Sequence, residues 1–190
     1  MNIRIRSALL ALAILLPFTN ASAGDYEETI GVFRNAGASG VFFGSAYGYA
    51  VFPTIGKAGF WVGGAYGDGR VYVGGRHVGD TSMTQLTVGL QLGAQAFHQI
   101  IFFQDKRSFE EFTGGNFEFS AEASAVAITA GASATTSTTG TSAGASGGQH
   151  DATTAGRSYN KGMAIFTVAK GGLMYEAVLG GQKFNYKPVR

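Results

Sequence analysis

The sequence contains no cysteine and few charged residues. In 190 residues there is no thiol, which excludes a disulfide framework, a cysteine-ligated zinc site and thiol catalysis. Charged residues make up 14% of the chain, against a usual ~25%. Glycine is abundant, with 30 residues, and Phe, Tyr and Trp number 15, 8 and 1. The aromatic content argues against a disordered chain, and the length suits one domain.

The N-terminus has the pattern of a secretory signal peptide. Arg4 and Arg6 precede an apolar run over residues 8–16, and the triplet Ala21-Ser22-Ala23 follows. The run is shorter than the ~20 residues of a membrane-spanning helix. We therefore expect residues 1–23 to be cleaved and residues 24–190 to form a single exported domain, in the periplasm or at the surface of a membrane. An uncleaved N-terminal anchor is the alternative.

Cleavage would remove the net charge. Two of the 14 Lys and Arg residues lie in the signal segment, which leaves 12 against 12 Asp and Glu. A chain without a basic excess has no strong field to hold a polyanion. We therefore expect no nucleic-acid partner.

The remaining chain predicts one helix followed by many strands. Residues 25–36 are expected to be helical, because Tyr26, Ile30, Phe33 and Val41 recur at helical spacing. A second short helix is expected over residues 105–112, capped by Asp105.

Period-two patterns and glycine turns predict the strands. Gly67-Asp68-Gly69 has the composition of a hairpin turn between strands at 59–63 and 70–73. The other strands are expected at 49–53, 86–92, 100–103, 117–125, 163–169, 173–179 and 183–186. The predicted fold class is α+β, mainly β: an antiparallel sandwich or small barrel of about eight short strands, with an N-terminal helix and one short internal helix.

A low-complexity segment interrupts the strands. Of residues 129–156, all but Gln149, His150 and Asp151 are Gly, Ala, Ser or Thr. Such a segment cannot bury enough apolar surface to offset the entropy of ordering it. We expect a flexible loop at about 131–156; a lid or a partner-binding loop is the alternative.

Catalytic and metal-binding patterns lack their structural context. Ser146 lies in a G-x-S-x-G string at 144–148, but inside this loop and without the strand and helix of a nucleophile elbow. His77, His98 and His150 have no metal-ligand spacing, although separated histidines can converge in a fold. We expect no catalysis, no cofactor and no metal.

Several spaced motifs resemble one family. The sequence resembles the SYLF-domain family, which includes lipid-binding proteins and yeast actin-patch proteins. The resemblance covers about residues 30–186. It is carried by YGYAVFPTIGKAGF at 47–60, GGAYGDG at 63–69, VGLQLGAQ at 88–95, FEEF at 109–112 with GGNF at 114–117, YNKG at 159–162 and GGLM at 171–174. It implies non-catalytic phospholipid binding. The basic N-terminal helix of eukaryotic members has no counterpart, since residues 25–36 are net acidic, and an exported chain would not meet actin.

The candidate lipid-binding residues combine cations with aromatic side chains. We expect Lys57, Lys106, Arg107 and Lys161 to face lipid phosphates, with Phe60 and Trp61 entering the boundary between headgroups and acyl chains. The alternatives are ordinary surface positions for the cations and core positions for the two aromatics. At the level of function, the alternatives are a small outer-membrane β-barrel protein and a structural envelope or stress protein. The oligomeric state stays open.

Overall fold

The computed structural model describes residues 22–59, 62–88, 94–119, 126–128, 159–170 and 181–190. Helices are α1 (Ala23–Asn35), α2 (Gly37–Gly40), the 3-10 turn η1 (Val41–Gly44) and α3 (Lys106–Thr113). Strands are β1 (Gly48–Gly59), β2 (Val62–Val73), β3 (Arg76–Val88), β4 (Ala94–Phe103), β5 (Phe117–Glu118), β6 (Val126–Ile128), β7 (Met163–Ala169) and β8 (Lys183–Pro188). Residues 1–21 of the expected signal segment and the low-complexity loop lie outside the described residues, as do Ser146, His150 and the strand expected at 173–179.

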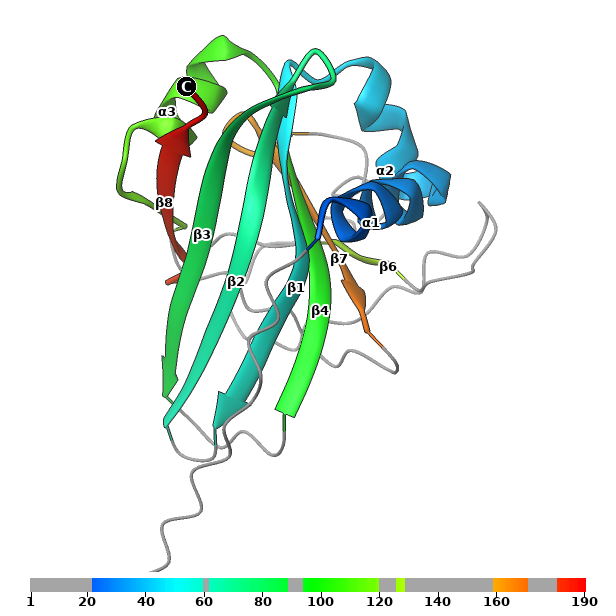
Figure 1. Cartoon of the computed structure of the whole chain (residues 1–190). Helices are drawn as coiled ribbons and strands as arrows, with labels where there is room; N and C mark the ends of the chain where they lie inside the picture. The colour runs from blue at the N-terminus through cyan, green and yellow to red at the C-terminus, as the bar shows by residue number, and fades with distance from the viewer. Residues whose placement is uncertain (1–21, 60–61, 89–93, 120–125, 129–158, 171–180) are drawn as a thin grey trace, which may run out of the picture.

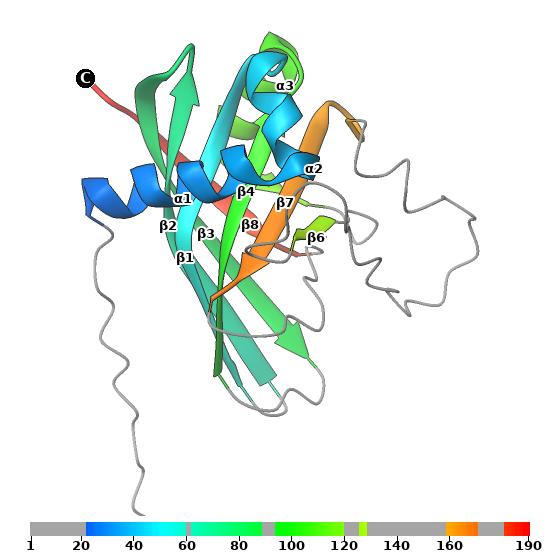
Figure 2. The same ribbon diagram turned by 90° about the vertical axis from the view of Figure 1, so that its right-hand side faces the viewer.

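The strands form one curled sheet, like half of a barrel (Figures 1 and 2). Their order is β5-β8-β3-β2-β1-β4-β7-β6. In the described sheet, β6 runs parallel to β7 and the other pairings are antiparallel. The predicted α+β, mainly β class, with an N-terminal helix and a short internal helix, is confirmed.

The two faces of the sheet carry separate aromatic cores. Side chains alternate along each strand, so Phe52 packs on the concave face while Val51 packs on the outer face. The concave core includes Phe103 and is closed at one end by Phe112 of α3. The outer core lies between the sheet and α1, α2 and η1. Figure 2 shows α1 and α2 beside the sheet.

Helix α1 docks on the outer face through one stripe of residues. Tyr26, Thr29 and Phe33 are buried, and the guanidinium of Arg70 lies 4.3 Å from the centre of the Tyr26 ring. The predicted helix is confirmed within two residues at its start. The expected continuation of its apolar face to Val41 is wrong, because the chain turns at Ala36 and leaves Val41 65% exposed.

The glycines of β2 are strand residues, so the predicted hairpin turn at 67–69 is wrong. A Cβ atom on Gly67 would lie 2.7 Å from the Ile55 side chain, and one on Gly69 would lie 2.5 Å from the Phe52 ring. Large side chains of β1 therefore occupy the space over these glycines, and β2 continues through them. The described turn between β2 and β3 is at Gly74-Gly75, where φ is 57° and 77°.

Strands β1 to β4 are 10–13 residues long, longer than expected. One reason is that Pro53, at which the strand was expected to end, lies inside β1 near an irregularity in its pairing with both neighbours. Another reason is that the first half of β3 is polar and lacks the alternating apolar residues from which strands were predicted. Gly48 and Lys57, near opposite ends of β1, are about 30 Å apart along the strand, at ~3.3 Å per residue.

A buried amide pair spans the concave face. Gln99 of β4 and Gln182, just before β8, are fully buried and exchange hydrogen bonds of 3.0 and 3.3 Å. Three strands separate β4 from β8 in the sheet, so only strong curling brings these side chains together. The hydroxyl of Thr167, the register partner of Gln99, is buried and finds no hydrogen-bond partner in the described structure.

Candidate functional site

Helix α3 begins at a well-formed cap. The Asp105 carboxylate accepts hydrogen bonds from the backbone N–H of Ser108 (2.8 Å) and from its hydroxyl (2.9 Å). These bonds hold the pKa of Asp105 below its usual value, the backbone bond contributing most. Phe112 points into the concave core and Phe109 packs against it, so the opposite side of α3, with Lys106 and Arg107, faces solvent.

The turn before β7 packs against the start of α3. The N–H of Gln104 donates to the carbonyl of Gly162 (2.9 Å). Gly162 has φ 82°, and a Cβ atom there would lie 2.1 Å from the Ser108 hydroxyl and 3.0 Å from Nη2 of Arg107. Only glycine can occupy position 162 of this turn. Because the turn packs so closely on α3, the exposed Lys161 lies beside the first turn of that helix.

The structure therefore divides the predicted cations. Lys106, Arg107 and Lys161 lie together, whereas Lys57 lies near the far end of β1, opposite Ala65 and Gln95. About 30 Å of strand separates Lys57 from the other three, because Gly48, at the near end of β1, pairs with Phe103. Phe60 and Trp61 lie outside the described residues.

Exposed apolar side chains gather at the same end as the three cations. Five large apolar residues are exposed in the described structure, among them Val41, Tyr47 and Val189. Val41 lies at this end because the ring of its neighbour Phe42 packs 5.1 Å from that of Tyr159, two residues before Lys161. The Tyr47 ring packs 5.7 Å from that of Phe109, and the N–H of Val189 donates to the carbonyl of Val78, near the start of β3. We call this surface the α3 end: Lys106, Arg107, Lys161, Val41, Tyr47 and Val189.

Sequence patterns did not reveal the apolar part of the α3 end. Tyr47 lies in one of the family-like motifs, but nothing in its spacing distinguishes it from a core residue. Exposure here depends on where η1 and the C-terminus finish in the fold (Figure 1), which is a tertiary property.

The cations of α3 are paired within the helix. Nζ of Lys106 lies 2.7 Å from Glu110, and Nη1 of Arg107 lies 3.4 Å from Glu111. The hydrogen bond to Glu110 raises the pKa of Lys106. All four side chains are more than half exposed. Such pairs are weak in water, so an external anion can compete for the cations.

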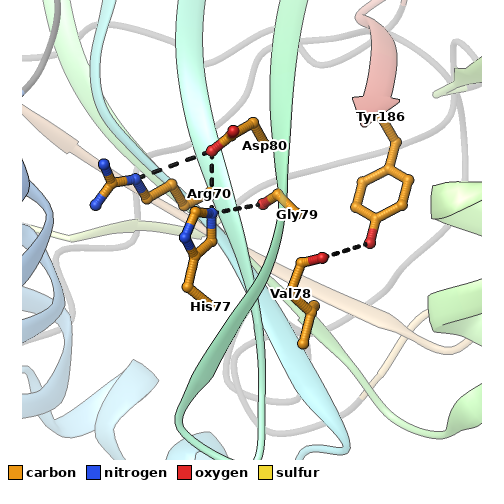
Figure 3. Close-up of polar contacts among 6 residues, drawn as sticks. All are labelled: Arg70, His77, Val78, Gly79, Asp80 and Tyr186. Atoms are coloured by element: carbon orange, nitrogen blue, oxygen red, sulfur yellow. Dashed lines mark hydrogen bonds and ion pairs between the residues drawn. The ribbon is translucent and has the colours of Figure 1, made fainter. Parts of the chain in front are cut away.

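The two described histidines have structural partners. Nε2 of His77 lies 3.0 Å from Oδ1 of Asp80 and 3.1 Å from the carbonyl of Gly79, and Arg70 approaches the same carboxylate at 4.0 Å (Figure 3). His98 lies under α1, with Nδ1 3.3 Å from the Thr29 hydroxyl. Burial, with Lys170 nearby, lowers the pKa of His98.

Two negative observations apply to the described residues alone. No group of three or more His, Asp or Glu side chains there is arranged to hold a metal ion. No helix in the described ranges has the length and apolarity to cross a membrane.

Comparison with known proteins places the chain in a family. The family model described as Ysc84, Las17-binding protein actin regulator, matches residues 84–184, more than half of the chain. The chain is also 28% identical over 157 residues to beta cell expansion factor A of Aeromonas veronii; the match covers 82% of this chain and 51% of that protein. The chain thus spans about half the length of this curated relative.

The matched region contains much of the site. Residues 84–184 include four of the six motifs that suggested the resemblance and all three cations of the α3 end. The motifs at 47–60 and 63–69 precede it. The resemblance inferred from the sequence is confirmed: the chain belongs to the Ysc84 family, the SYLF-domain proteins, a family of lipid-binding domains.

Proposed function

We propose that this protein is a non-catalytic phospholipid-binding protein of the periplasm, and that it docks peripherally on membranes through the α3 end. The observation that carries the proposal is the gathering of three cations and three exposed apolar side chains at one end of the sheet. Peripheral binding usually requires both kinds of contact, since neither a few charges nor a small apolar area holds a protein to a bilayer alone. The periplasmic location rests on the signal-like N-terminal sequence.

The expected energies are consistent with reversible docking. Each cation close to an anionic leaflet contributes ~1 kcal/mol at most, and this contribution falls with salt. Val41, Tyr47 and Val189 would add the burial of their exposed parts, at ~25 cal/mol per Å². Together these terms support binding that depends on anionic lipid and on ionic strength.

Helix α1 is not suited to this role. Its exposed residues include Asp25, Glu27 and Glu28, and Arg34 is its one cation. Its apolar stripe is already buried against the sheet. We therefore assign lipid contact to α3 and its neighbours.

The test is flotation with vesicles. The full chain is expressed, and the exported product is purified without detergent and mixed with phosphatidylcholine vesicles that contain or lack phosphatidylglycerol. The triple variant K106Q/R107Q/K161Q should lose at least about tenfold in partitioning onto the anionic vesicles at low salt. The control K57Q/K170Q/K183Q removes the same charge away from the α3 end and should bind like the wild type. Equal losses in both variants, or no binding by the wild type, would refute the proposal.

A further inference from the structure

The order of charged residues along α3 is unfavourable for the stability of the helix. Lys106 and Arg107 lie in its first turn, where the helix dipole disfavours cations, and the carboxylates of Glu110 and Glu111 lie toward its C-terminal end, where the dipole disfavours anions. Each basic residue also precedes its acidic partner by four positions, the less favourable order for such pairs. Optimising α3 for stability would give the reverse arrangement.

The arrangement does keep the two cations close to carboxylates. The exposed face of α3 presents two basic and two acidic side chains, with ion pairs of 2.7 and 3.4 Å. With the cap carboxylate of Asp105 counted, the charged groups of α3 carry no positive excess, and the turn with Lys161 lies beside them. An anion that binds Lys106 or Arg107 must first displace a side chain of the same helix.

We propose that Glu110 and Glu111 are intramolecular competitors that limit the affinity of the α3 end for anionic lipid. The proposal rests on the proposed function and concerns its regulation. A lipid phosphate replaces each carboxylate as partner of the cation, and the freed carboxylate turns to solvent. Because every such exchange needs an anion close by, docking requires a dense anionic leaflet and fails on a sparsely charged one.

Arg107 is well placed for this exchange. Its Nη1 atom faces Glu111, whereas Nη2 lies over the turn at Gly162, next to Lys161. A phosphate that takes the place of the Glu111 carboxylate would bind at Nη1, while Nη2 stays over the turn.

The experiment compares E110Q/E111Q with the wild type and with a matched control. E27Q/E28Q removes the same adjacent pair of charges from the exposed face of α1, on the outer face of the sheet. Partitioning is measured on phosphatidylcholine vesicles with increasing phosphatidylglycerol. E110Q/E111Q should bind about tenfold more tightly at low salt and reach half-saturation at a lower anionic fraction. E27Q/E28Q should follow the wild-type curve.

Two further results separate this mechanism from other causes. Adding K106Q/R107Q to E110Q/E111Q should abolish the gain, since the freed cations would be gone. Thermal unfolding of E110Q/E111Q should remain close to that of the wild type, because weak pairs and unfavourable dipole contacts are lost together. An equal gain in E27Q/E28Q would show an effect of net charge and overturn the proposal.

Failure of the proposal differs from failure of the proposed function. If the wild type binds through the α3 end and E110Q/E111Q binds no better, the carboxylates do not compete and the inference is wrong. If K106Q/R107Q/K161Q binds as well as the wild type, the α3 end is not the docking surface and both statements fail.

Discussion

At the scale of single residues, the packing of the sheet depends on glycines, whose lack of a side chain leaves room for neighbouring rings. The Phe52 ring lies where a side chain on Gly69 would be, and the Tyr186 ring does the same at Gly79, within 2.3–2.6 Å of the hypothetical Cβ atom. A curled sheet brings its inward-facing side chains close together, and glycine on one strand makes room for an aromatic ring from the next. The high glycine content is therefore partly a packing requirement.

Replacing Gly69 with alanine should destabilise the fold. The added methyl group would overlap the Phe52 ring and the Thr81 side chain, and overpacking of this kind costs about 1–3 kcal/mol. Urea unfolding should show a lower midpoint for Gly69→Ala. The control is Gly56→Ala, also in a strand, where a Cβ atom would meet nothing within 4 Å. If both variants unfolded at the same midpoint, packing at Gly69 would not be the cause.

At the scale of elements, the sequence predicted correctly the helices and strands that a short local pattern defines. β7 has the predicted bounds, and α3 lies within one residue of its predicted range, because an apolar run and an Asp cap are each sufficient signals. The prediction wrongly split β2 into two strands with a turn at 67–69, because Gly67 and Gly69 are typical turn residues. Their place within a strand depends on side chains of β1, which a local pattern does not show.

The cap of α3 predicts an acid-dependent effect. Because hydrogen bonding lowers the pKa of Asp105 in the folded state, its stabilising effect is complete above its unfolded pKa of about 4 and is lost as pH falls through the lower folded value. Asp105→Ala should therefore lower the thermal midpoint at neutral pH, and the difference from the wild type should shrink as the pH falls below the unfolded pKa of about 4 and through the lower folded value. A difference that stays constant over this range would contradict the assignment. Glu27→Ala, at an exposed position of α1, is the control.

At the scale of the whole molecule, the curl of the sheet depends on contacts that no local pattern predicts. Gln99 and Gln182 are 83 positions apart and meet across the concave face. For the same reason, the grouping of Lys161 with Lys106 and Arg107, and the separation of Lys57, required the topology of the sheet. The sequence contains the cationic residue types that bind phosphate, and the family motifs include Lys57 and Lys161 among them. The fold determined which of them share a surface.

The amide pair should behave as a coupled unit. Gln99→Met leaves the Gln182 amide buried without its partner, and Gln182→Met does the converse, so each should cost about 1–3 kcal/mol of unfolding free energy. The double variant should cost less than the sum of the two. Additive losses would show that the pair does not join β4 to β8. Thr167→Val, which removes a buried hydroxyl without a partner, should be neutral or stabilising.

The length of the central strands gives the molecule a stand-off distance. With the α3 end on a bilayer, the far end of β1 would project about 30 Å into the surrounding fluid, roughly three to four Debye lengths at physiological salt. Charged groups at that end of β1, such as Lys57, would be screened from the surface potential of the leaflet beneath. The sheet would then act as a rigid post that carries one end of a small protein clear of the headgroups on which its other end rests.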